Sequence, residues 1–82
     1  MLYGSLMSIE FPTRVSKIIH RHNKVVAELI TKKLKSVNPN NQAELSQLVG
    51  WLNGVATVET KPDLKREIVN VRSKVQQYAN QR

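Results

Sequence analysis

The chain has 82 residues and no cysteine, and its 13 Lys and Arg outnumber its 6 Asp and Glu to give a net charge of +7. The length allows one domain with a thin core. The lack of cysteine excludes disulfides, thiol chemistry and zinc sites built on thiolates. Aromatic residues make up only 5% of the chain, so we expect an aliphatic core.

Residues 1–12 show no helical period, and Pro12 ends a short alternation of polar and apolar residues. We therefore expect an extended N-terminal arm. The uncharged run from Met1 to Ile9 is too short to span a bilayer and lacks the features of a signal peptide. Met7 is a second candidate for the initiator, and the sequence does not distinguish it from Met1.

The clearest helical pattern covers residues 13–36. Thr13 is a suitable N-cap, and Asn38–Asn41 ends the pattern with a turn-forming sequence. Residues at three- and four-residue spacing define one apolar face roughly 140° wide. They are Val15, Ile18, Ile19, His22, Val25, Val26, Leu29 and Ile30. The pattern predicts one continuous helix whose apolar face packs into the core.

A second helix is predicted over residues 41–54. Asn41 and Glu44 have the spacing of a capping box, and Gly54 is a suitable C-terminal stop. Its apolar face is formed by Leu45, Leu48, Val49, Leu52 and Val55. We expect residues 55–61 to form a connection to the next helix.

Pro62 begins the third predicted helix, over residues 62–79. A narrow, heptad-like apolar seam follows one side of this helix. It consists of Leu64, Ile68, Val71, Val75 and Tyr78. Together the patterns predict an all-α protein, with a compact three-helix domain over residues 13–82 behind an extended arm at 1–12.

Basic residues lie beside the apolar face of the first predicted helix. On a continuous helix, six of them fall within a strip roughly 80° wide, interrupted by Glu28. They are Arg14, Lys17, Arg21, Lys24, Lys32 and Lys35. Lysine predominates, which favours contact with phosphates or an acidic partner over bidentate reading of bases. The alternative interpretation is an ordinary solvated face.

The third-helix seam and the single tryptophan allow two interpretations. They form either a protein interface, including one between two copies of the chain, or part of the three-helix core. The residues concerned are Trp51, Leu64, Ile68, Val71, Val75 and Tyr78.

Residues 42–50 resemble the first helix and glycine turn of the helix-turn-helix family of DNA-binding proteins. The resemblance implies a recognition helix over residues 53–60, and that segment contains no Lys or Arg. The segment from Ser8 to Pro12 resembles the short strand of ribbon-helix-helix repressors, which implies pairing with a second subunit in the major groove. Asn23-Lys24 is then the only candidate for the turn between the two helices.

Catalytic patterns are lacking. His20 and His22 lie two residues apart and so point to different sides of a helix, which is unsuited to joint metal binding. The three glycines are scattered at positions 4, 50 and 54, so no glycine-rich phosphate loop is formed. We expect no enzymatic activity, metal, cofactor or small-molecule substrate.

Basic charge without catalytic motifs favours a small regulatory protein that acts on a nucleic-acid complex. It either binds DNA or RNA phosphates directly or acts as a modulator or corepressor of a DNA-bound transcription factor. In size and charge the chain is similar to small regulators encoded by phages and plasmids. The alternative is an adaptor or inhibitor that binds an acidic protein without nucleic acid. We expect a cytoplasmic location and no membrane partner.

Overall fold

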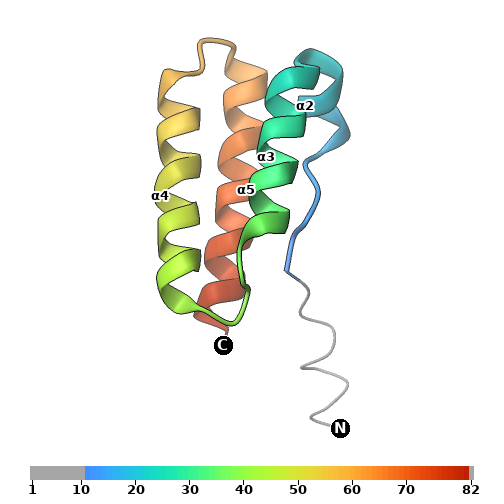
Figure 1. The fold of residues 1–82 in the computed structure, drawn as a ribbon. Helices are drawn as coiled ribbons and strands as arrows, with labels where there is room; N and C mark the ends of the chain where they lie inside the picture. The colour runs from blue at the N-terminus through green and yellow to red at the C-terminus, as the bar shows by residue number, and fades with distance from the viewer. Residues whose placement is uncertain (1–10, 82) are drawn as a thin grey trace, which may run out of the picture.

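The computed structural model describes residues 11–81, which contain four helices and no strand. In chain order these are α2 (Lys17–His22), α3 (Lys24–Ser36), α4 (Gln42–Val58) and α5 (Pro62–Asn80). The three longer helices run along a common direction, and α2 lies at the end of the bundle where α3 begins (Figure 1). The predicted all-α fold is confirmed.

Helices α4 and α5 form an antiparallel hairpin (Figure 1). Each contributes one row of buried aliphatic side chains at the three- and four-residue spacing of a helix face. The rows are Leu45, Leu48, Leu52 and Ala56 on α4, and Leu64, Ile68, Val71 and Val75 on α5. The helix predicted over residues 62–79 is confirmed to within one residue.

Burial of the α5 row contradicts one of the two interpretations of the third-helix seam. Leu64, Ile68, Val71 and Val75 are at most 4% exposed, so they cannot present an interface without unfolding the domain. Their place is in the core because α5 is the element against which both α4 and α2 pack. Tyr78, the last residue of the seam, is half-buried.

The predicted N-cap of the second helix, Asn41, is confirmed, but the predicted C-terminal end at Gly54 is wrong. The Asn41 side chain accepts hydrogen bonds from the amides of Ala43 and Glu44 at 3.0 and 3.2 Å. The Glu44 carboxylate accepts from the Asn38 amide at 3.0 Å, so it stabilises the preceding turn instead of completing a capping box. Gly54 does not stop the helix, which continues to Val58 because buried Ala56 anchors its last turns.

The continuous helix predicted over residues 13–36 is wrong. The first helix starts after Ser16, whose hydroxyl accepts from the Ile19 amide at 3.3 Å, so Thr13 is not its cap. The chain then bends at Asn23, which has an extended backbone conformation. The Asn23 amide donates to the Ile19 carbonyl at 2.8 Å, and its side chain accepts from the Val26 amide at 3.1 Å. One residue therefore ends α2 and begins α3.

The bend also changes which residues face the core. The residues buried on α2 and α3 are Ile19, Ala27, Ile30 and Leu34. Val25 and Leu29, which the pattern placed on the apolar face, are 75% and 53% exposed, and His22 is exposed as well. The predicted face was wrong because it assumed one helical phase on both sides of Asn23.

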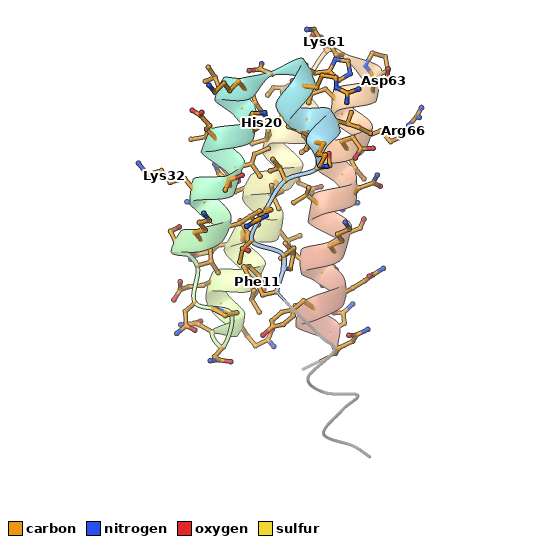
Figure 2. All side chains as sticks on the ribbon, turned by 90° about the vertical axis from the view of Figure 1, so that its right-hand side faces the viewer. Phe11, His20, Lys32, Lys61, Asp63 and Arg66 are labelled. Carbon is orange, nitrogen blue, oxygen red and sulfur yellow. The ribbon has the colours of Figure 1, made fainter. Side chains whose placement is uncertain are left out.

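The core of the described residues consists of twelve aliphatic side chains, which confirms the predicted aliphatic core. Phe11, Trp51 and Tyr78 pack against its edge. Residues 11–16 have no regular secondary structure and run along the bundle between α3 and α5 (Figure 2). The Phe11 ring meets the Tyr78 ring edge-on, with centroids 5.3 Å apart, and so fixes this segment near the end of α5. The rest of the predicted arm, residues 1–10, lies outside the described residues.

Candidate functional site

Charge is distributed unevenly among the elements of the bundle. Residues 11–36, which we call the basic layer, carry seven Lys and Arg and a single carboxylate, Glu28. Helix α4 carries no Lys or Arg, and its one charged residue is Glu44. Helix α5 is mixed, with four Lys and Arg against two carboxylates. Most of the positive charge of the described fold therefore belongs to one layer.

The cations of the basic layer are available to a partner. All seven are exposed to solvent, and within residues 11–81 none forms a salt bridge with a carboxylate. They are Arg14, Lys17, Arg21, Lys24, Lys32, Lys33 and Lys35. An anion that approaches this layer thus meets charges that no carboxylate of residues 11–81 neutralises.

The single strip predicted for six of these cations does not exist, because it required a continuous helix. Arg14 lies in the irregular segment, Lys17 and Arg21 lie on α2, and the other three lie on α3. The bend at Asn23 turns the chain back, so the segment before α2 runs beside α3 (Figure 2). The cations are therefore spread over three elements instead of forming a line along one helix.

Three of the predicted residues meet around one hollow of about 520 Å³, which we call the basic hollow. Arg14 and Val15 of the irregular segment form one wall, His20 comes from α2, and the remaining lining residues come from α3. The α3 residues are Glu28, Thr31, Lys32 and Lys35. Figure 2 shows Lys32 extending away from the bundle into solvent. His20 was not predicted as a site residue, because its place here depends on the chain folding back at Asn23.

Arg21 belongs to a different surface. It lines a hollow of about 270 Å³ between α2 and the start of α5, together with His22 and Arg66. Two carboxylates, Asp63 and Glu67, line the same hollow and offset its positive charge. Lys17 and Lys24 are exposed and line neither hollow. Of these two hollows, the basic hollow therefore has the larger excess of positive charge.

Trp51 connects the basic layer to the hairpin. It is half-buried on α4, and the Lys33 ammonium of α3 lies 5.6 Å from its ring centroid. A cation–π contact of this kind at an exposed site contributes about 0.5–1 kcal/mol. Trp51 thus packs at the edge of the core, and its exposed part lies beside a cation.

Residues 11–81 contain no group of three or more His, Asp or Glu side chains that could hold a metal ion. No helix in this part of the chain is long and apolar enough to cross a membrane. The turn that the helix-turn-helix resemblance requires at Gly50 is absent, because α4 passes through it. Most of the strand suggested by the ribbon-helix-helix resemblance lies outside the described residues.

The chain matches no protein family, no curated protein and no solved structure. Function is therefore inferred from the charges and shape of the basic layer.

Proposed function

We propose that the protein is a non-enzymatic regulator that acts on a nucleic-acid complex, and that its basic layer contacts the phosphate backbone. The observation that supports this proposal is the division of charge, with seven cations against one carboxylate in residues 11–36 and no cation on α4. A cationic face on one side of a small domain attracts a polyanion and orients the domain toward it.

The chemistry of the cations favours backbone contact. Five of the seven are lysines, which act as flexible point charges, whereas bidentate reading of guanine typically uses arginine. Each phosphate that they neutralise releases condensed counterion. Binding should therefore weaken as the salt concentration rises. On duplex DNA, each phosphate contact contributes about −0.9 to the slope of log K against log salt.

A mobility-shift titration at two salt concentrations tests the proposal. The test variant removes three cations of α3, Lys24→Gln, Lys32→Gln and Lys35→Gln, and should bind at least tenfold more weakly with a smaller salt slope. The matched control removes three exposed cations outside the layer, Lys61→Gln, Lys65→Gln and Lys74→Gln, and so changes the net charge equally. Equal weakening of both variants would show that net charge, and not the basic layer, governs binding.

Two exposed apolar residues favour a second candidate, an adaptor that binds an acidic protein. Val25 and Leu29 lie one turn apart on α3, within the basic layer, and both are mostly exposed. Apolar contacts surrounded by cations suit an acidic protein surface better than a phosphate backbone. A supershift of a nucleic-acid complex from a cell extract, without binding to naked nucleic acid, would indicate the modulator form of the proposal. Absence of both effects would favour the adaptor.

A further inference from the structure

The shape of the basic hollow indicates a ligand that makes more than phosphate contacts. A phosphate backbone can be bound by cations on a convex surface, whereas here the cations surround a depression of about 520 Å³. This volume lies within the range of roughly 300–1,000 Å³ that is typical of sites for small ligands. A ligand that contacts the cations and also enters the depression carries a negative charge joined to a group small enough to fit.

The lining residues indicate a planar group. Arg14 and His20 contribute a guanidinium and an imidazole, the two kinds of planar polar side chain on which unpaired bases stack. Val15 and Thr31, which also line the hollow, are half-buried and supply apolar surface. Lys35 and Lys32 lie on the α3 side, where they can meet phosphates that flank an inserted base.

We propose that the basic hollow accepts one unpaired nucleotide, so that the protein prefers single-stranded nucleic acid to duplex. This inference rests on the proposed function, since it names the class of nucleic acid that the same layer binds. A base within a duplex is stacked and paired, and taking it out costs a few kcal/mol. An unpaired base enters the hollow without that cost, while duplex contacts only the surrounding cations.

Glu28 gives the hollow a preference among bases. Among residues 11–81 it is the only carboxylate that lines the hollow, and a carboxylate accepts hydrogen bonds but cannot donate them. Cytosine, adenine and guanine carry an exocyclic amino group that donates to such an acceptor, whereas thymine carries none and offers only its ring N3–H. Glu28 also repels phosphate, so the base and not the phosphate is directed inward. Oligo(dC) should therefore bind more tightly than oligo(dT).

Fluorescence anisotropy with a labelled oligo(dC) strand and a duplex of equal length tests the proposal. We expect the wild type to bind the single strand about tenfold more tightly, since stacking of a base on a side chain contributes about 1–3 kcal/mol. Thr31→Leu narrows the hollow without adding a planar ring, His20→Ala removes a stacking surface, and neither changes a Lys or Arg. Both variants should lose the preference for single strands while still binding duplex, and circular dichroism should show that both are folded.

The outcomes separate this inference from the proposed function. Equal binding of single strand and duplex by the wild type, or a preference that survives both substitutions, would overturn the nucleotide site and leave the phosphate-binding proposal standing. Binding of neither nucleic acid would overturn both the nucleotide site and direct phosphate binding, and would leave only the modulator form, which the extract supershift tests. Cytidine 5′-monophosphate should displace the single strand, whereas inorganic phosphate at the same concentration should not. Equal displacement by phosphate would show that the hollow binds an anion without the base.

Discussion

The α4–α5 hairpin and the basic layer use their apolar and charged residues in opposite ways. In the hairpin, one row of aliphatic side chains from each helix is buried against the other, and α4 has no cation at all. The basic layer buries only four aliphatic residues, leaves Val25 and Leu29 mostly exposed, and presents seven cations to solvent. The comparison indicates that the hairpin provides most of the stability, while the basic layer provides the surface for binding.

The largest expected effect tests whether the hairpin provides most of the stability. Leu52→Ala removes a fully buried side chain from the hairpin and should lower the free energy of unfolding by about 2–5 kcal/mol. Val25→Ala, in the basic layer, should change it by no more than about 0.5 kcal/mol because Val25 is exposed. Urea titrations of both variants measure the difference. Similar losses for both would show that Val25 is buried in solution, as in a dimer.

The second prediction concerns the bend at Asn23, which shapes the basic layer. Asn23→Ala removes the side-chain acceptor for the Val26 amide and should cost about 0.5–2 kcal/mol. Asn53→Ala is the matched control, because Asn53 is an exposed residue within α4 and caps no helix. Thermal melts compare the two variants. An unchanged melting temperature for Asn23→Ala would mean that the cap does not hold the bend.

A third prediction tests how the irregular segment is held against the hairpin. Phe11→Leu loses the edge-on contact with Tyr78, and such aromatic pairs contribute about 0.5–1.5 kcal/mol beyond the burial of their area. A double-mutant cycle with Tyr78→Leu isolates this coupling. Limited proteolysis should become faster within residues 11–16 and stay unchanged in α4. A coupling of zero would mean that the two rings pack independently.

The smallest expected effect has the opposite sign. Gly50→Ala and Gly54→Ala should each stabilise the protein by up to about 1 kcal/mol, because both glycines lie within α4. Neither has a positive φ, and a Cβ at either position would meet no atom within 4 Å. Destabilisation by either substitution, measured by thermal melt, would show that another chain approaches this face of α4.

The hairpin was easier to predict from the sequence than the basic layer, because the residues that define its helices lie within or directly before them. Pro62 and the heptad-like spacing after it locate α5, and Asn41 marks the start of α4. The end of α4 was predicted too early, because a glycine within a helix resembles a stop until the packing of Ala56 on the core is known.

The basic layer was less predictable because its shape depends on one residue. The cations could be identified from the sequence, but their arrangement could not. The apolar pattern continues through Asn23 without a change of phase, although Ser16 and Asn23 are both residue types that favour N-caps. The basic hollow also requires Arg14 and His20 to lie beside α3, which only the bend brings about.

Asn23 therefore determines the shape of the basic layer. A straight helix over residues 17–36 would be about 30 Å long and would place Ile18, Val25 and Leu29 on a common apolar face. The bent form buries Ile19 completely, which contributes about 1.5–3 kcal/mol, and adds the Asn23 cap. The nucleotide site proposed for the basic hollow requires this bend, so a nucleotide bound there would stabilise it by mass action.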